Sequence, residues 1–300
     1  MEFRHILFPV DFSKPCQDAA SWVNAMAELF QAKVTLLSVI EIPSILCSES
    51  GGTLRFGAVS SEDIEHFCRG QLEAFRTNHF LDARAEIVQA EGDPATVIGR
   101  HVEANSVDLI MMPTRGHGPF RPGLLGSVTA KVLHDVKCSV WTTSHSETLS
   151  PDPLRCDTIL CSVDALESAE STASLIRSAA ALAERFKARL ALVHATPSHS
   201  ELADEAAGIP ARSAEAQIRA NAARLQEMAG VKASVCIKHG SVEALIRSAV
   251  REYRAGLVVI GRGHLADEKD LFRSHVYWIV RASPCPVLSV YVKSPATLNQ

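Results

Sequence analysis

The chain has 300 residues, of which 47% are hydrophobic and 21% are charged, and its formal net charge is −4. This is the composition of a soluble globular protein with room for two domains of ordinary size. The weakly negative charge excludes a general attraction to nucleic acid or to anionic membranes, since both require a concentrated positive field. No apolar run is long enough to span a membrane, and the N-terminal residues do not resemble a signal peptide.

Predicted strands and helices alternate along the first half of the chain. Pro15 lies in the first turn of the first helix, where the missing backbone N–H does no harm. The expected elements are a strand at 5–10, a helix at 14–31, a strand at 33–40, a helix at 61–78, a strand at 83–90, a helix at 94–105, a strand at 108–113, a Gly- and Pro-rich loop at 114–125, a helix at 126–136 and a strand at 138–143.

The second half repeats this order after a linker at 145–156. Its expected elements are a strand at 157–163, a helix at 166–186, a strand at 188–194, a helix at 212–229, a strand at 232–238, a helix at 241–253, a strand at 257–261, a helix at 271–282 and a strand at 286–292.

Three pairs of similar segments indicate that one unit has been duplicated. The segments Ile6–Asp11, Asp108–His117 and Cys138–Thr142 of the first half correspond to Ile159–Asp164, Gly256–His264 and Cys285–Ser289 of the second. We therefore predict two domains, at 1–145 and 155–300. Because the strands are continuous apolar runs that alternate with helices, each domain is expected to be an α/β unit whose parallel sheet is covered on both faces.

Polar residues that could bind a ligand follow two of these strands. Asp11 ends the first strand, and the loop after the fourth contains four glycines, Arg115 and Arg121. Ligands of open α/β sheets bind at the carboxyl ends of the strands. Glycines such as Gly116 and Gly126 permit positive φ and close approach of backbone N–H groups, and the arginines, the Ser127 hydroxyl and the helix N-terminus favour phosphate. Asp11 suits a base or a sugar instead.

Other interpretations of the same residues remain open. Gly and Pro mark turns of any kind, so the loop could be an ordinary turn before a capped helix. The chain lacks a Walker loop, a complete G-x-G-x-x-G fingerprint and a G-x-S-x-G elbow. A triad of Asp11, His117 and Ser127 is conceivable, but nothing orders these residues as nucleophile, base and orienting group.

At these residues the chain resembles the universal stress protein family in its tandem form, over essentially its whole length. The ATP-binding branch of that family carries G-x-x-G, nine residues, then G-[ST]. Here Pro113-Thr-Arg-Gly116 is followed after nine residues by Gly126-Ser127, with proline in place of the first glycine. The resemblance implies two tandem doubly wound domains, each with a five-stranded sheet of order 3-2-1-4-5, that pair through their last strands.

The resemblance also implies a bound nucleotide in the first domain. Pro9-Val10-Asp11 matches the Pro-x-Asp of the family at the end of the first strand, which implies a contact on the adenine side, and Val39 falls at the second adenine contact. Gly116, Gly126 and Ser127 then hold the phosphates of ATP, with Mg²⁺, and Arg115 adds charge.

The second half departs further from the family pattern. In ungapped register His264 stands at the second glycine and Ser274-His275 replaces Gly-Ser, whereas a one-residue gap would align Arg262 with Arg115. Ser162 and Ala195 replace Pro9 and Val39, and the loop carries three carboxylates that would repel a triphosphate, Asp267, Glu268 and Asp270. We therefore expect a degenerate second copy.

The leading hypothesis is an ATP-binding regulatory protein of cytoplasmic stress adaptation, with slow hydrolysis at most and a protein partner that the sequence does not name. The alternative is an adenylating enzyme of the related adenine-nucleotide hydrolase-like group, although its S-G-G-x-D-S motif is absent and Pro9-Val-Asp-Phe-Ser13 stands there. A third possibility is an assembly protein without a ligand. Because apolar edge strands are normally covered, we expect the two halves to pair within the chain and two chains to associate as a homodimer.

Overall fold

The computed structural model describes residues 1–41, 61–80, 85–116, 124–143, 155–163, 169–196, 211–263 and 275–292. The chain divides into two compact units. The first unit comprises Glu2–Pro119 and Gly126–Val136, and the second is built mainly of Lys137–Gln300. The first unit therefore holds most of the first sequence repeat, whereas the closing strand of that repeat belongs to the second unit.

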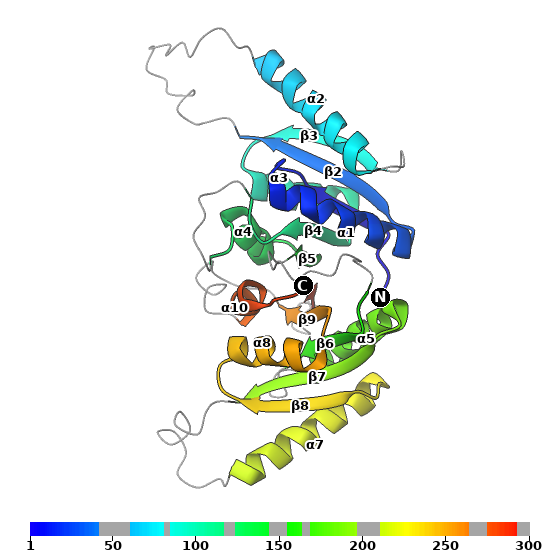
Figure 1. Cartoon of the computed structure of the whole chain (residues 1–300), viewed down its shortest axis with the longest axis vertical. Helices are drawn as coiled ribbons and strands as arrows, with labels where there is room; N and C mark the ends of the chain where they lie inside the picture. Colours follow the sequence, from blue (N-terminus) through cyan, green and yellow to red (C-terminus); the bar gives the residue numbers. More distant parts are fainter. Residues whose placement is uncertain are drawn as a thin grey trace, which may run out of the picture. The chain divides into compact units, whose positions relative to one another are not determined.

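The first unit contains the strands and helices expected for the first repeat, with ends that differ by a few residues (Figure 1). In chain order they are β1 (His5–Pro9), α1 (Lys14–Phe30), β2 (Lys33–Ile40), α2 (Ser61–His79), β3 (Ala85–Glu91), α3 (Pro94–Asn105), β4 (Leu109–Pro113) and α4 (Ser127–Asp135).

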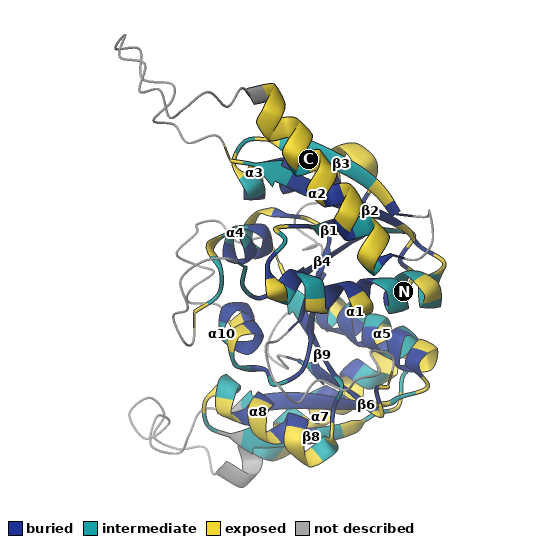
Figure 2. Ribbon diagram, turned by 45° about the horizontal axis from the view of Figure 1, so that its top comes forward, coloured by how far each residue is buried: buried dark blue, intermediate teal, exposed yellow. Residues whose placement is uncertain are grey.

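The strands of the first unit are parallel and lie in the order β3-β2-β1-β4. The register pairs Pro9 with Leu37 and Ile6 with Leu109. The middle strands are almost completely buried, which is why the sequence shows them as unbroken apolar runs (Figure 2). Because parallel strands all end at the same edge of a sheet, the residues that follow β1, β2 and β4 meet there.

Helices α1 and α3 begin at side chains that cap them. The Ser13 hydroxyl accepts a hydrogen bond from the backbone N–H of Cys16 (3.3 Å) at the start of α1, and Asp93 accepts one from the N–H of Thr96 (3.0 Å) at the start of α3. In both helices a proline occupies the first turn. These caps explain why the two helix starts were predictable within a residue or so.

The second unit begins with the closing strand of the first repeat and continues through the second repeat (Figure 1). Its elements are β5 (Ser139–Thr143), β6 (Thr158–Ser162), α5 (Ala169–Phe186), β7 (Arg189–Thr196), α7 (Ala211–Ala229), β8 (Ser234–His239), α8 (Val242–Tyr253), β9 (Leu257–Arg262), α10 (His275–Ala282) and β10 (Val287–Tyr291).

The second repeat has the strand order that the sequence resemblance implied. Its parallel strands lie as β8-β7-β6-β9-β10, which is the order 3-2-1-4-5. β5 pairs with β10 in the antiparallel direction and places Val140 opposite Ser289 and Thr142 opposite Val287. The closing strands of the two repeats therefore pair with each other, and each buries its apolar side chains.

Candidate functional site

Asp11 lies just beyond β1 and is held there by Ser13. The backbone N–H of Val10 still donates to the carbonyl of Leu37 (2.8 Å), and Asp11 then leaves the sheet with an exposed side chain. Its Oδ1 accepts hydrogen bonds from the N–H (3.0 Å) and the hydroxyl (2.6 Å) of Ser13, which is only 3% exposed. Since Ser13 also caps α1, the carboxylate of Asp11 is fixed to the start of that helix.

The turn between Asp11 and Ser13 requires an unusual backbone conformation at Phe12. Phe12 has φ of 62°, in the left-handed region that bulky residues rarely adopt. Two contacts hold it there: its carbonyl accepts a hydrogen bond from the side-chain amide of Gln17 (3.1 Å), and its ring packs edge-on against Phe75 with 6.1 Å between centroids. A residue held in this way keeps Asp11 in one orientation.

Gly116 places the glycine-rich loop directly against Asp11. A Cβ atom built on Gly116 would lie 2.0 Å from Oδ2 of Asp11 and 3.2 Å from its Cγ. Only a residue without a side chain allows the carboxylate and the loop backbone to approach so closely. Asp11 and Gly116 are 105 positions apart in the sequence, and the structure brings them into contact.

The two ends of the loop after β4 are tied to each other. The N–H of Gly126 donates to the carbonyl of Thr114 (2.9 Å), and the buried hydroxyl of Thr129 donates to the carbonyl of Pro113 (3.1 Å). These bonds hold the start of α4 against the end of β4. The role of Thr129 could not be predicted, because a threonine in a short helix has no distinctive sequence pattern.

The helix that follows the loop begins without a side-chain cap. Gly126 is the N-cap residue, with φ −62° and ψ 146°, and Ser127 is the exposed first residue of α4. Gly116 and Gly126 could adopt positive φ, but neither does so. Gly118, Gly123, His117 and Arg121 lie outside the described residues. Among the described residues no side chain caps the first N–H groups of α4, which suits an anion.

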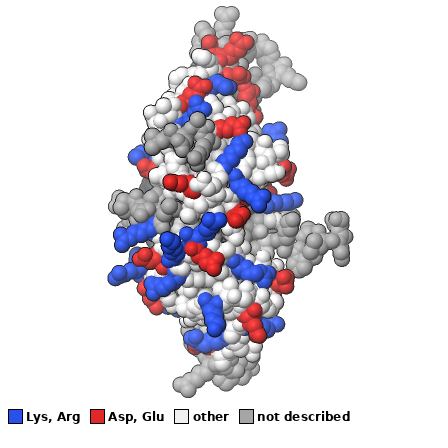
Figure 3. Space-filling model, turned by 90° about the vertical axis from the view of Figure 1, so that its right-hand side faces the viewer, with Lys and Arg blue, Asp and Glu red and all other residues white. Residues whose placement is uncertain are grey.

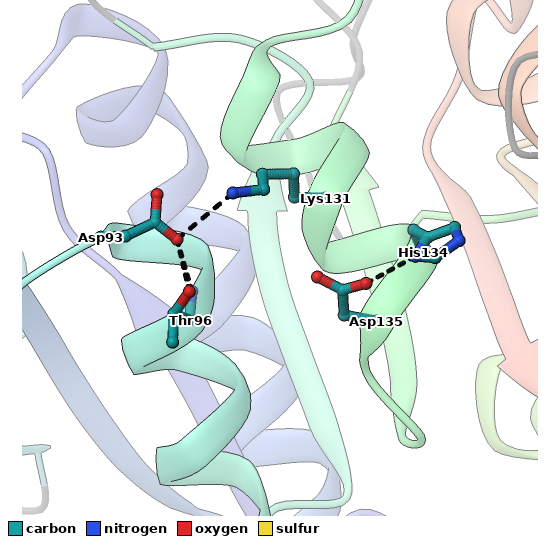
Figure 4. A network of polar contacts seen from close by, with 5 residues as sticks. All are labelled: Asp93, Thr96, Lys131, His134 and Asp135. Atoms are coloured by element: carbon teal, nitrogen blue, oxygen red, sulfur yellow. Dashed lines mark hydrogen bonds and ion pairs between the residues drawn. The ribbon is translucent and has the colours of Figure 1, made fainter. Parts of the chain in front are cut away.

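A polar network braces α4 against α3 (Figure 4). Asp93 caps α3 through the N–H and hydroxyl of Thr96, and Lys131 of α4 lies 3.5 Å from the same carboxylate. These hydrogen bonds from Thr96, followed by the charge of Lys131, lower the pKa of Asp93. The sequence analysis identified neither Asp93 as a cap nor Lys131 as its partner on another helix.

The remaining predicted residues lie around this assembly. Pro9 is half-buried at the end of β1, Val10 is buried, and Arg115 is half-buried next to Gly116. Val39 is half-buried one strand away on β2, where it pairs with Ala90. All of them lie at the carboxyl edge of the sheet, so the predicted base side and phosphate side belong to one region.

Strand registers show how the second repeat corresponds to the first. Ile6 pairs with Leu109 as Ile159 pairs with Leu257, so the fourth strands of the two repeats correspond residue by residue. Arg262 therefore corresponds to Thr114, and the gapped alignment of Arg262 with Arg115 is wrong. At the position of Gly116 the second repeat has His264, which lies outside the described residues, as do Asp164, Asp267, Glu268 and Asp270.

Arg262 points into the protein instead of toward a ligand. It is only 2% exposed, and it donates hydrogen bonds to the carbonyl of Cys138 (2.7 Å) and to the hydroxyl of Ser289 (3.2 Å). Its guanidinium lies 5.6 Å from the ring centroid of Tyr291, and burial lowers the pKa of Arg262 to about 10. In the second repeat the carboxyl end of β9 is therefore connected to neighbouring segments by the Arg262 side chain.

In the part of the chain that the structure describes, no helix is long and apolar enough to cross a membrane. The same residues contain no group of three or more His, Cys, Asp or Glu side chains arranged to bind a metal ion.

Comparison with known proteins identifies the family. The model of the universal stress protein family matches residues 2–144 and again 156–290. The chain belongs to the universal stress protein family. Universal stress protein Sll1654 of Synechocystis is 30% identical over 139 residues, which cover 46% of this chain and 83% of that protein. Universal stress protein MJ0577 of Methanocaldococcus jannaschii is 27% identical over 143 residues, which cover 44% of this chain and 88% of that protein.

A solved universal stress protein has the same tandem architecture. The crystal structure of a universal stress protein from Archaeoglobus fulgidus aligns with a TM-score of 0.69 at 20% identity, covering 97% of this chain and 98% of that chain. At this level of identity the likeness supports the fold, so the function must be argued from the residues of the site.

Proposed function

We propose that the first repeat of this universal stress protein binds ATP with Mg²⁺ and uses the bound nucleotide for regulation. The observation that carries the proposal is the contact between Asp11 and Gly116, which places an anchored carboxylate at the base of a loop leading to the uncapped N-terminus of α4. A hydrogen-bond acceptor beside a phosphate-binding helix start fits a nucleoside phosphate.

Each end of the site suits a different part of the nucleotide. The N–H groups at the start of α4, the exposed hydroxyl of Ser127 and the guanidinium of Arg115 suit the phosphates. An ionised Asp11 can only accept hydrogen bonds, so it suits the amino group of the base or a hydroxyl of the sugar. Val39 would contact the base. Mg²⁺ would be held chiefly by phosphate oxygens, as is usual for nucleotide complexes.

The proposal assigns one nucleotide to each chain, bound by the domain at 1–145. In the domain at 155–300, His264 replaces the glycine that lets the loop approach Asp11, and Arg262 is buried among strands. We assign the protein to cytoplasmic stress adaptation, acting on a protein partner. A homodimer would need a surface other than β5 and β10, because these closing strands pair with each other.

Calorimetry with ATP and Mg²⁺ tests this function. We expect one site per chain, with affinity lost in Asp11→Ala and retained in Asp164→Ala, the matched change in the second repeat. Two equal sites, or no binding by the wild-type protein, would refute the proposal. Incubation with ATP distinguishes this proposal from the enzyme hypothesis, because an adenylating enzyme must form a product other than ADP.

A further inference from the structure

The amino-terminal edge of the second repeat's sheet carries a cluster of basic residues, here called the basic edge. All are exposed: Arg155, Lys187, Arg189, Lys232 and Arg254. The register pairs Arg189 with Thr158, Ala191 with Ser234, and Ile159 with Leu257, so these residues lie at or just before the starts of neighbouring strands. Four segments that are distant in sequence thus contribute cations to one edge.

The basic edge is compact. The strand order β8-β7-β6-β9 makes it three strand spacings wide, or about 14 Å. Figure 3 views the molecule from the right-hand side of Figure 1, where these strands begin, and shows many Lys and Arg side chains in its lower half. Asp157, at the start of β6, lies among the five cations and leaves a clear positive excess.

The cluster is weaker at the corresponding positions of the first repeat. The paired registers place Glu2, Gln31 and Ser106 where the second repeat has Arg155, Lys187 and Arg254. Lys33, which corresponds to Arg189, forms an ion pair with Glu86 at 2.6 Å. Arg84, which corresponds to Lys232, lies outside the described residues, and Arg4 corresponds to Asp157. The positive excess is therefore larger in the second repeat than in the first.

The helix dipole accounts for only two of the five cations. Lys187 and Arg254 have φ of 53° and 49° at the carboxyl ends of α5 and α8, where a positive charge interacts favourably with the helix dipole. Arg155, Arg189 and Lys232 begin or precede strands, and a strand start provides no such compensation. Like charges at this spacing repel one another, so the cluster gains from an anionic partner.

We propose that the basic edge docks an acidic segment of a partner protein. In an extended chain, carboxylates at alternate positions i, i+2 and i+4 share one face and span about 13 Å, which matches the width of the edge. Three of the five cations are arginines, whose planar guanidinium groups suit carboxylates. Association through such contacts is steered by charge and depends on salt.

Other polyanions fit the edge less well. Single-stranded nucleic acid is usually bound with aromatic side chains on which bases stack, and the exposed large aromatic residue of the described chain, Phe67, lies in the other unit. Peripheral membrane binding usually uses a helix with cations beside an apolar face. The basic edge is made of strand starts and helix ends, so it offers no such face.

Fluorescence anisotropy of the full chain with a labelled peptide of alternating Glu and Ser tests the proposal. Three variants are compared: wild type, the edge variant Arg155→Glu/Arg189→Glu/Arg254→Glu, and the control variant Arg219→Glu/Arg224→Glu/Arg247→Glu. The control has the same net charge, but its changes lie on exposed helix surfaces of the same unit. Circular dichroism establishes that each variant is folded.

We expect the wild type and the control to bind the peptide and the edge variant to lose about tenfold or more in affinity, since three exposed charge contacts are removed. Binding should also vanish as the ionic strength rises toward about 1 M, where the Debye length falls to about 3 Å. Absence of wild-type binding at low salt, equal losses in both variants, or tighter binding of duplex DNA or phosphatidylserine vesicles than of the peptide would each overturn the proposal. If the edge variant does not fold, the proposal is still tested by the salt dependence of wild-type binding and by the relative affinities of the wild type for the peptide, duplex DNA and phosphatidylserine vesicles.

Discussion

Replacing Gly116 with alanine should damage the site, although the backbone there would accept alanine. Gly116 does not have positive φ, so the effect comes from the added Cβ atom alone. That atom would lie 2.0 Å from Oδ2 of Asp11, about 1 Å closer than real Cβ contacts allow. Asp11 would have to turn away and give up its two hydrogen bonds with Ser13.

The size of the effect follows from those bonds. Hydrogen bonds to a charged group are worth about 1.5–3 kcal/mol, but Asp11 is exposed and water replaces part of each bond. We therefore estimate a loss of about 1–2 kcal/mol, which corresponds to roughly a tenfold weaker ATP complex. The melting temperature should fall by only about 2–4 °C.

Gly126→Ala is the matched control, because the family motif marks both glycines. A Cβ atom on Gly126 would meet its nearest neighbours at 3.5–3.7 Å, which is ordinary contact, and its φ of −62° suits alanine. Calorimetry with ATP and Mg²⁺ should show a clear loss for Gly116→Ala and a small one for Gly126→Ala. The opposite ranking, or wild-type affinity in Gly116→Ala, would refute the reasoning.

Three further changes probe the surrounding structure. Asp93→Ala should lower the free energy of unfolding by about 1 kcal/mol, because the cap of α3 is lost. The difference from wild type should shrink as pH falls below about 4, because the pKa of Asp93 is lowered in the folded protein and its contribution to stability is lost once the carboxylate is protonated. Urea unfolding at several pH values measures both effects. Arg262→Ala should cost about 2–4 kcal/mol in the same assay, because it leaves a cavity and an unpaired buried carbonyl at Cys138; a stability within error of wild type would contradict the strand-binding role. Brief alkylation at pH 8 followed by mass spectrometry should spare Cys16, Cys156, Cys161 and Cys285, since burial raises their thiol pKa values to about 11–12. Among the cysteines in the described residues, the half-buried Cys68 should be modified first.

The strands and the duplication were predictable because they depend on apolar periodicity and on repeated motifs, whereas the strand order of the second repeat was implied by the resemblance to the family. The placement of Asp11 and of the loop containing Gly116 at one edge was predictable because both follow strands that end there, but their direct contact was not predicted. The backbone conformations of Gly116 and Gly126 were not predictable, because glycine adopts many conformations with similar ease.

Contacts made by single side chains across long sequence separations were also beyond prediction. Thr129 binds the carbonyl of Pro113, and Lys131 reaches Asp93 from another helix, yet both residues look like ordinary members of an amphipathic helix. Arg262 stood in a motif that suggested a ligand contact, and only the strand registers showed that it occupies a different position and is buried.

The antiparallel pairing of β5 with β10 has an evolutionary consequence. In a symmetric dimer of identical chains, every substitution appears on both sides of the interface and in both sites at once. Joining the two copies in one chain removes that constraint, because each copy then mutates alone. One copy could keep the glycine at position 116 while the other acquired His264, Arg262 and a basic edge. Covalent linkage of the repeats thus allows corresponding positions to carry different residues, such as Gly116 and His264.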